Sequence, residues 1–278
     1  MTATISETGV QTKIGIRNVS KEFTVRDAGE PFTALSGIDL DVREGEFLTL
    51  VGPSGCGKST LLDLVAGLTE PTSGQIVVNG APVTGPGLDR GIVFQQYALF
   101  PWRTALANVA FGLEAKGVPR AERTERARRH LELVGLSGFE DRYPHELSGG
   151  MRQRVAIARS LAFDPDVLLM DEPFAALDAQ TRESLQEELL RIWQHTRKTV
   201  VFITHGIDEA VYLGQRVAVM TSRPGRIKEI IEVEFDSREG DLRADPRFGE
   251  YRHHVWGLLR DEVAAAQVQE RKAAIRHD

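Results

Sequence analysis

A glycine-rich loop stands between a short apolar segment and a helical pattern in the first quarter of the chain. The loop is Gly52-Pro53-Ser54-Gly55-Cys56-Gly57-Lys58-Ser59-Thr60. Before it, Phe47 to Val51 are predicted to form a buried strand, and after it Leu61, Leu62, Leu64 and Val65 follow a helical pattern. Glycines let a backbone wrap closely around a phosphate, and the first N–H groups of a helix carry partial positive charge. The order of strand, loop and helix is that of a phosphate-binding P-loop.

Two side chains of this loop have their own expected roles. Lys58 adds a full positive charge near the β and γ phosphates, and Ser59 supplies a hydroxyl to Mg²⁺. We therefore expect all nine residues, Gly52 to Thr60, to bind a nucleoside triphosphate, which the family resemblance described below implies to be ATP.

A second apolar strand, Val167 to Asp171, ends in two carboxylates. A strand end places Asp171 beside the P-loop, where it can hold the Mg²⁺ shell, while Glu172 can orient and polarise an attacking water. Taken alone, the pattern is also that of a strand followed by an acidic turn. With the P-loop before it, the pair indicates a nucleoside triphosphatase.

Short β-branched runs alternate with helical patterns, which predicts an α/β fold. The predicted strands are 13–19, 47–51, 75–79, 91–95, 167–171, 199–204, 216–221 and 226–235. Helix dominates between Gln95 and Asp171, where Pro119 can open a helix with i,i+4 pairs Glu122–Arg126 and Glu125–Arg129. This segment is interpreted as a helical insertion. Near the end, Phe248, Tyr251, Val255, Leu258 and Leu259 recur at helical spacing and predict a C-terminal helix that packs back on the domain.

Composition excludes several classes of protein. The 278 residues carry a formal net charge of −6, so the chain lacks the basic excess of a nucleic-acid-binding protein. The longest apolar runs, Val167 to Met170 and Val200 to Ile203, are far shorter than the roughly 20 residues that cross a bilayer. Cys56 is the single cysteine, so an internal disulfide is impossible and a reducing cytoplasm fits.

The segment Leu147-Ser148-Gly149-Gly150-Met151-Arg152-Gln153 precedes a predicted helix. Physically it is a second anion site, because its glycines expose N–H groups at a helix start. With this segment the chain resembles the ATP-binding subunits of ABC transporters, whose signature is a Ser-Gly-Gly run opening a helix. The resemblance implies a P-loop NTPase core with a β subdomain and a helical insertion bearing the signature. The ATPase domain would cover residues 13–241, with a helical subdomain at about 97–163, and residues 242–278 would form a C-terminal helical extension.

The same resemblance assigns further site residues. Gln95 matches the glutamine that reaches Mg²⁺ and the attacking water, and His205 the histidine that contacts the γ-phosphate. Asp178, in Ala176-Leu177-Asp178, matches the loop that crosses to the other subunit. Phe23 matches the aromatic on which adenine stacks; the alternative is a core aromatic.

In this family two subunits pair head to tail, so the resemblance implies that ATP on one P-loop is completed by Ser148, Gly149, Gly150 and Asp178 of the second copy. A symmetric dimer makes two such composite sites. ATP and Mg²⁺ are the implied cofactors. We expect Lys58, Mg²⁺ and the signature to neutralise charge, Glu172 to act as general base, and His205 to position the γ-phosphate.

Spacing separates the possible branches of the family. About fifty residues lie between Gln95 and Ser148, too few for the long coiled coil of chromosome-organising ATPases, and the single P-loop excludes two-cassette proteins. Three segments look like importer subunits of the nitrate, sulfonate and taurine group: Phe94 to Trp102, Gly85 to Arg90 and Ser222 to Arg226. An exporter ATPase and a soluble ABC ATPase without a membrane partner remain the alternatives.

The favoured function is an ATP-hydrolysing subunit of an importer for nitrate, taurine, an aliphatic sulfonate or a similar small solute. It would be peripheral on the cytoplasmic face of the cell membrane, bound to transmembrane permease subunits and served indirectly by an extracytoplasmic solute-binding protein. Tyr97, Phe100 and Trp102 are interpreted either as a docking groove for a permease helix or as domain core.

Overall fold

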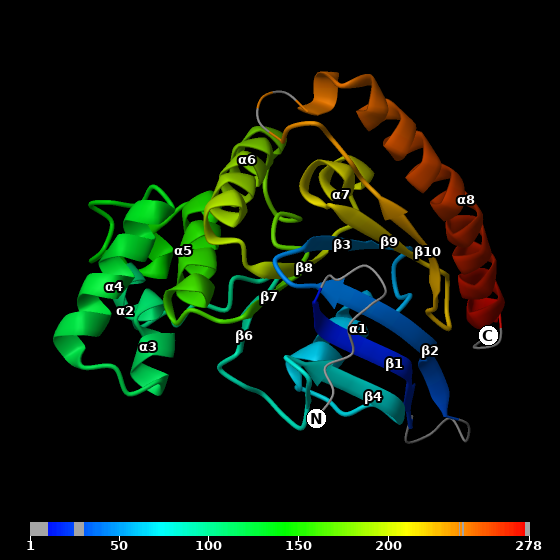
Figure 1. Ribbon diagram of the computed structural model, residues 1–278, viewed down its shortest axis with the longest axis horizontal. Helices are drawn as coiled ribbons and strands as arrows, with labels where there is room; N and C mark the ends of the chain where they lie inside the picture. Colours follow the sequence, from blue (N-terminus) through cyan, green and yellow to red (C-terminus); the bar gives the residue numbers. More distant parts are fainter. Residues whose placement is uncertain (1–10, 25–30, 239, 241, 276–278) are drawn as a thin grey trace. The chain divides into compact units, whose positions relative to one another are not determined.

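Strand β3 (Phe47–Val51) leads into the glycine-rich loop and is buried along its whole length in the computed structural model (Figure 1). The structure describes residues 11–24, 31–238, 240 and 242–275, with side chains up to residue 266 in the last helix. The chain divides into two units, Met1–Pro86 with Val201–Asp278, and Gly87–Val200. Residues 241 and 276–278, which belong to the predicted domain and extension, lie outside the described residues.

In the first unit, β3 lies in a largely parallel sheet. Its strands follow the order β10 (Ile227–Glu232), β9 (Arg216–Met220), β3 and β8 (Thr199–Ile203). β3 and β9 run parallel, whereas β10 is antiparallel to β9. Every residue of β3, β8 and β9 is buried. This is why their sequences are apolar nearly throughout, as strands covered on both faces require.

A second, antiparallel sheet has the strand order β2-β1-β4-β5. The strands are β1 (Thr12–Phe23), β2 (Phe32–Arg43), β4 (Ser73–Val78) and β5 (Ala81–Pro82). β2 and β5 were absent from the predicted strands, and that prediction was therefore incomplete. In β2, Ile38, Leu40 and Val42 are buried while Asp39 and Asp41 are not. Such alternation belongs to a sheet with only one face in the core, and a search for continuous apolar runs passes over it.

The core of the first unit lies between this antiparallel sheet, β3 and helix α1 (Lys58–Ala66). Its packed side chains are Ile14, Ile16, Leu40, Val42, Leu48, Leu50, Leu61, Leu62, Val65, Val201 and Ile203. The strand before the P-loop and the helix after it therefore pack into the same apolar core. This packing holds both ends of the P-loop in place.

The second unit combines a strand pair with helices. β6 (Arg90–Val93) runs parallel to β7 (Val167–Asp171). Between them lie α2 (Ala105–Val109), α3 (Phe111–Ala115), α4 (Arg120–Leu133), the 3₁₀ turn η1 (Pro144–Glu146) and α5 (Gly149–Ala162), and after β7 comes α6 (Ala179–Thr196). The helix predicted after Pro119 is confirmed as α4. Its two predicted pairs are present, with Arg126–Glu122 at 3.7 Å and Arg129–Glu125 at 3.6 Å.

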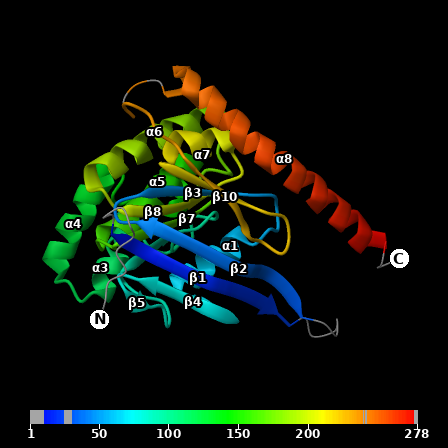
Figure 2. The ribbon, with the colours of Figure 1, turned by 45° about the vertical axis from the view of Figure 1, so that its right-hand side comes forward.

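The C-terminal part of the first unit contains α7 (Ile207–Leu213), the 3₁₀ turn η2 (Leu242–Ala244) and the long helix α8 (Pro246–Ile275). Figures 1 and 2 show α8 running past α7 and the hairpin of β9 and β10. Phe248 and Val255 of α8 are buried. The helix expected from the spacing of these residues is confirmed, and it packs against its own unit.

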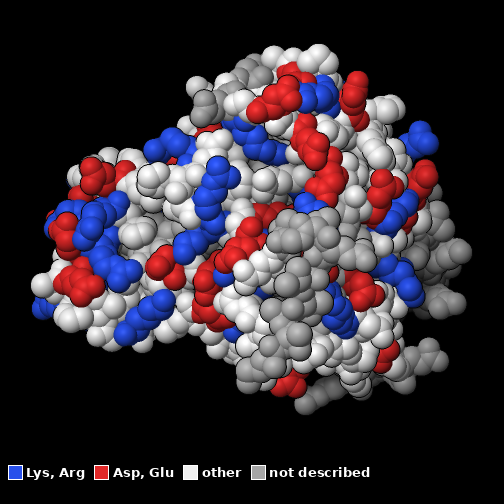
Figure 3. Space-filling model, viewed as in Figure 1, with Lys and Arg blue, Asp and Glu red and all other residues white. Residues whose placement is uncertain are grey.

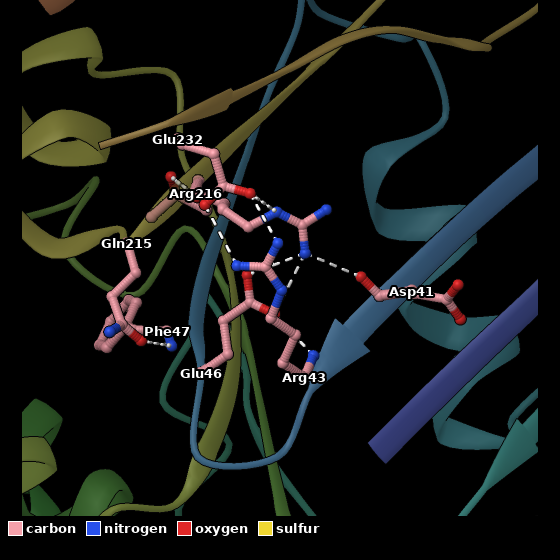
Figure 4. Close-up of polar contacts among 8 residues, drawn as sticks. Asp41, Arg43, Glu46, Phe47, Gln215, Arg216 and Glu232 are labelled. Atoms are coloured by element: carbon pink, nitrogen blue, oxygen red, sulfur yellow. Dashed lines mark hydrogen bonds and ion pairs between the residues drawn. The ribbon is translucent and has the colours of Figure 1, made fainter. Parts of the chain in front are cut away.

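A cluster of charged side chains joins the two sheets of the first unit. Arg216 is largely buried, and its Nη1 donates to Glu46 Oε1 at 3.1 Å and to the carbonyl oxygen of Asp41 at 3.0 Å. Its Nε lies 3.4 Å from Glu232, which also binds Arg43 at the surface (Figure 4). This buried charge is tolerated because it lies between two carboxylates, those of Glu46 and Glu232, and donates to a backbone carbonyl.

The surface carries both signs of charge. On the face shown in Figure 3, Lys and Arg are interspersed with Asp and Glu over the described residues. No helix in the described ranges combines the length and apolar character needed to span a membrane. The fold class predicted from the sequence, an α/β P-loop NTPase core, is confirmed.

Candidate functional site

The P-loop has the local geometry that its sequence predicts. β3 ends at Val51 and α1 begins at Lys58, with Gly57 as N-cap at φ 102°. A Cβ at Gly57 would lie 2.6 Å from Leu35 Cδ2, so both the backbone angle and the packing require glycine there. The N-terminus of α1 therefore follows directly on the loop, as phosphate binding requires.

Lys58 is the charged centre of the loop. Its side chain is buried, and Nζ donates to the carbonyl oxygens of Gly52 at 2.8 Å and Pro53 at 3.0 Å. The ammonium therefore folds back against the start of the loop. Ser54, Gly55 and Ser59 are exposed on the same segment.

Cys56 is buried inside the loop, with Sγ 3.8 Å from Lys58 Nζ. Burial raises the pKa of the Cys56 thiol, and this outweighs the lowering by the nearby Lys58 charge. The thiolate, which is the reactive form, is therefore scarce at neutral pH and shielded from reagents.

We expect iodoacetamide to alkylate native Cys56 about tenfold or more slowly than free cysteine at neutral pH. The rate should rise only as the pH passes above the ordinary range of a thiol, since the pKa is raised. Protein that has been alkylated should lose ATP binding. Mass spectrometry over time gives the rate, a fluorescent ATP analogue gives the binding, and a Cys56→Ala protein treated in parallel is the control. Full nucleotide affinity after complete alkylation would contradict this expectation.

The loop between β9 and β10 supports the P-loop from outside. Arg223 donates through Nε and Nη2 to the carbonyl oxygen of Gly55, at 3.2 and 3.0 Å. Gly225 lies so close to Cys56 that a Cβ at Gly225 would collide with the Cys56 carbonyl oxygen. The resemblance of the segment Ser222 to Arg226 to importer subunits did not predict this contact with the P-loop.

His205 follows β8 and lies beside the P-loop within the first unit. A pocket of about 320 Å³ has Gly52, Pro53, Ser54, His205 and Ile207 on one side. The turn that carries His205 is fixed by Thr204, whose hydroxyl donates to buried Glu209 and accepts from the Gly206 N–H at 2.9 Å. The structure thus brings together two predicted parts of the ATP site, the P-loop and His205.

Asp171 and Glu172 stand at the end of β7 in the second unit, and both are half-buried. Glu172 has φ 46°, in the left-handed region that a residue with a Cβ seldom adopts. Unfavourable backbone angles of this kind gather at functional sites, where the surroundings hold them. Their approach to the P-loop, which lies in the other unit, stays a prediction.

The predicted second anion site forms the start of α5. Ser148 is the N-cap of this helix, and its hydroxyl accepts from the Met151 N–H at 3.2 Å. Gly149 and Gly150 are the first two residues of the helix. A Cβ at Gly149 would lie 3.3 Å from Tyr97 Oη, so the signature segment and the segment after Gln95 are neighbours within the second unit.

Gln95 is exposed and lies just beyond β6, which ends at Val93. Tyr97 and Ala98 have φ of 53° and 47°, and Arg159 of α5 holds both carbonyl oxygens, at 3.1 Å for Tyr97 and 2.6 Å for Ala98. The guanidinium of Arg152 lies 5.5 Å from the Tyr97 ring centre. The segment after Gln95 is thus clamped to the helix that begins with the signature.

Asp178 and Phe23 occupy element ends. Asp178 is the N-cap of α6, and its carboxylate accepts from the Thr181 N–H at 3.0 Å, which holds the pKa of Asp178 below its ordinary value. Phe23 closes β1 with its residue 40% exposed and with Lys21 Nζ 5.1 Å from the ring centre. This exposure agrees with a stacking surface and disagrees with a core aromatic.

The aromatic run in the second unit forms a surface cluster of Phe100, Trp102 and Phe111. Phe100 lies 5.7 Å from Trp102 and 4.7 Å from Phe111, measured between ring centres. Trp102 is 72% exposed, so the interpretation of this residue as domain core is wrong. Asn108, fully buried, pins the loop: its Nδ2 donates to the Phe100 carbonyl oxygen at 3.2 Å, and its Oδ1 accepts from the Phe100 N–H at 2.8 Å.

Sequence reasoning missed Asn108, Arg159 and Arg223 as supporting residues. A buried asparagine between apolar neighbours is a signal for Asn108, since Ala105 and Val109 continue the buried face of α2. No local pattern marks Arg159 or Arg223, because both act on carbonyl groups far away along the chain.

The donor set predicted for a metal consists of oxygens: the Ser59 hydroxyl, the Gln95 amide and the Asp171 carboxylate. This suits Mg²⁺, which is usually held by one or two carboxylates together with substrate phosphates. Among the described residues, no group of three or more His, Cys, Asp or Glu could hold a metal by itself. The chain's own residues therefore fit Mg²⁺ that arrives with a nucleotide.

Comparisons with known proteins agree with this arrangement. Residues 35–175 match the family described as ABC transporter. The chain is 57% identical over 254 residues to an uncharacterized ABC transporter ATP-binding protein of Methanocaldococcus jannaschii, covering 91% of this chain and 94% of the relative. It is 50% identical to a taurine import ATP-binding protein of Pseudomonas fluorescens, covering 87% of this chain and 94% of the relative. It is 51% identical to a nitrate import ATP-binding protein of Synechocystis, covering 82% and 88%.

Solved structures give the same result. A dimeric ATP-binding cassette in a post-hydrolysis state with ADP and phosphate superposes with a TM-score of 0.70 at 34% identity. A second dimeric structure of the same bacterial ABC transporter cassette gives 0.71 at 35% identity. Each match covers 80% of this chain and 99% of the solved chain.

Proposed function

Since this chain belongs to the ABC transporter family as an ATP-binding subunit, we propose that it hydrolyses ATP to drive import of a small oxyanion or zwitterion. The solute class is nitrate, taurine, an aliphatic sulfonate or a similar molecule. Relatives at about half identity are named for taurine and nitrate import, which supports this class. An exporter ATPase or a cassette without a membrane partner is the competing function.

One observation carries the proposal: the chain builds two helix starts suited to anions. α1 begins at Lys58 directly after the P-loop, and α5 begins at Gly149 under the Ser148 cap. Each start offers N–H groups and partial positive charge. The P-loop of one copy is sufficient to bind a phosphate. The second anion site, at the start of α5, is therefore explained best if it binds a phosphate held by the P-loop of a second copy.

We propose the head-to-tail dimer on this basis. ATP on Lys58 and the P-loop of one copy would be completed by Ser148, Gly149 and Gly150 of the other, with Asp178 beside them. A solved relative of this fold is a dimeric cassette in both of its structures, which supports the arrangement. ATP then favours the closed dimer because it contacts both copies, and hydrolysis removes that preference.

The chemistry assigned to the site needs charge neutralisation and a positioned water. Lys58 would neutralise the β and γ phosphates, His205 would position the γ-phosphate, and Glu172 would accept the proton of the attacking water. Mg²⁺, held by Ser59, Gln95 and Asp171, would neutralise charge on the phosphate oxygens.

The experiment that tests this function is affinity isolation of the chain from membranes of its own cell. Co-purification of hydrophobic permease subunits, with ATPase activity that a solute and its binding protein stimulate, is the expected result. A chain recovered alone, with the same ATPase activity in every fraction, would favour the cassette without a membrane partner. The chain is proposed to lie peripherally on the cytoplasmic face, and its peripheral attachment is tested by the same fractionation, since salt or alkali should release the chain from the permease.

The cluster of Phe100, Trp102 and Phe111 is proposed as the docking surface for the permease. It is apolar, exposed and pinned by Asn108, and it joins the Tyr97 segment that Arg152 and Arg159 hold against α5. An apolar helix of a partner can bury itself in such a surface. A movement of the permease helix would shift the Tyr97 segment, and this segment would in turn shift the signature residues at the start of α5.

We expect Trp102→Ala to lower solute transport by about 10- to 100-fold, the loss that a buried aromatic anchor causes in an interface. Basal ATPase activity of the isolated subunit should stay unchanged, because Trp102 is 72% exposed and supports no core. Transport into vesicles and ATPase activity are measured on the same preparations. His253→Ala, at an exposed position of α8, is the control. Transport at the original rate in Trp102→Ala vesicles would remove this cluster as the docking surface.

A further inference from the structure

The far wall of the pocket beside the P-loop is an apolar stripe of α8. Trp256, Leu259, Val263 and Ala266 line the same pocket as Pro53, Ser54 and His205. Their spacing of three and four residues puts them on one face of the helix. Trp256 is 52% exposed, whereas Leu259 is buried. The outer part of the stripe is therefore open to an approaching molecule.

The stripe is held firmly at the level of the pocket. Glu262 accepts from the Ser222 N–H at 2.8 Å and from Lys228 Nζ at 2.7 Å, and Lys228 also donates to the Leu258 carbonyl oxygen at 3.0 Å. Burial alone would raise the pKa of Glu262, but Lys228 and Ser222 outweigh it and lower the pKa. Glu262 therefore stays charged at neutral pH and keeps α8 fastened to the β9–β10 hairpin.

The same hairpin loop holds the P-loop. Ser222 binds α8, and its neighbour Arg223 donates to Gly55. The loop between β9 and β10 thus binds α8 through Ser222 and the P-loop through Arg223. The stripe cannot be displaced from the P-loop face without breaking the contacts of Glu262.

We propose that the stripe of α8 extends the ATP-dependent dimer interface, and that its occupant is a second copy of this chain. The inference rests on the proposed head-to-tail dimer and adds a surface to it. A partner that brings its Ser148 to a phosphate on the P-loop must approach the face that Pro53 and Ser54 share with Trp256. A half-exposed tryptophan next to that contact is the kind of anchor that carries binding energy in interfaces.

The test uses the full chain with Glu172→Gln, which is expected to hold ATP without hydrolysing it. Trp256→Ala is added to this background, and the dimer dissociation constant is measured with ATP by analytical ultracentrifugation. The expected result is a dimer weakened by about 10- to 100-fold at an ATP concentration that saturates each variant. Val263→Asp, which places a charge on the stripe, should weaken the dimer at least as much.

Asp261→Ala is the matched control. Asp261 is five residues beyond Trp256, so it lies on the other side of α8, and its side chain is 72% exposed. Its removal should leave the dimer unchanged. Circular dichroism of each variant confirms that α8 and the fold are intact.

Other outcomes overturn the inference. An unchanged dimer with Trp256→Ala and Val263→Asp means that the second copy does not touch the stripe. A stronger dimer means that α8 shields the P-loop face from the partner. If Glu172→Gln binds ATP yet forms no dimer even without changes in α8, the proposed dimer itself fails and the inference fails with it.

Discussion

Replacing Glu172 by Gln is expected to lower ATP turnover by on the order of 10²- to 10⁴-fold, the range that a general base contributes. Glutamine has nearly the same shape as glutamate but cannot accept a proton from the attacking water. Lys58 and the N-terminus of α1, which are proposed to bind the phosphates, are untouched by the change. ATP affinity should therefore be retained, and the ATP-bound dimer should accumulate.

Three measurements on purified protein check this result. Phosphate release gives turnover, a fluorescent ATP analogue gives affinity, and size-exclusion chromatography with ATP gives the dimer. Glu183→Gln is the matched control, because it makes the same chemical change at an exposed position of α6. Turnover at the original rate by Glu172→Gln would assign the base to another group, and loss of ATP binding would assign Glu172 to the nucleotide instead of the water.

Replacing Arg216 by Met is expected to lower the free energy of unfolding by about 3–5 kcal/mol, the usual loss when one partner of a buried ion pair is removed. The side chain of Glu46 is 3% exposed and that of Arg216 is 9% exposed. Methionine fills much of the space of the arginine stem but leaves the Glu46 carboxylate without its guanidinium. The Asp41 carbonyl oxygen loses its Arg216 donor as well.

The loss should also depend on pH. Burial raises the pKa of Glu46, although the Arg43 N–H and the Arg216 charge act against it. A raised carboxyl pKa favours the protonated folded form, so this contribution to stability is present at low pH and is lost as pH rises through the folded pKa. Without Arg216 the pKa of Glu46 rises further. The loss of unfolding free energy in Arg216→Met, relative to the original protein, should therefore grow as pH increases from about 5 to about 8.

Urea unfolding at several pH values measures this effect. Arg43→Met is the control, because Arg43 pairs with Glu232 at the surface, where its side chain is 42% exposed. Exposed pairs contribute about 0–1 kcal/mol, so the control should differ little from the original protein. A deficit in Arg216→Met as small as that of the control would show that water reaches Glu46.

The strands whose bounds were predicted most closely are those covered on both faces, whereas the predicted bounds of the half-covered strands β1, β4 and β10 differ from the structure at both ends. The predicted bounds of β3 and β7 agree with the structure at both ends, because Phe47 to Val51 and Val167 to Asp171 are apolar runs closed by glycine or by carboxylates. β2 was missed because Asp39 and Asp41 point away from the core and break the run. Local pattern therefore predicts buried strands better than half-covered ones.

The site residues also divide into those that a local sequence pattern predicts and those that it does not. The P-loop and the helix that opens with Ser148, Gly149 and Gly150 are local in sequence, and the structure has the strand and helices on which they were placed. Arg223 on Gly55, Arg159 on Tyr97 and the α8 wall opposite Pro53 join residues far apart along the chain. Such contacts leave no periodic signal, and they become visible only when the chain is folded.

The contacts of Lys58 predict that phosphate binding at this loop is an exchange of partners. Its ammonium already donates to the carbonyl oxygens of Gly52 and Pro53, so a nucleotide competes with groups of the protein for the same protons. Affinity then reflects the difference between phosphate and carbonyl as acceptors, and charged acceptors are about twice as strong as neutral ones. A loop of this kind holds its lysine in a defined place before the ligand arrives. Such a loop also favours anionic ligands over neutral ones, because a neutral acceptor would not bind the Lys58 ammonium more strongly than the carbonyl oxygens already do.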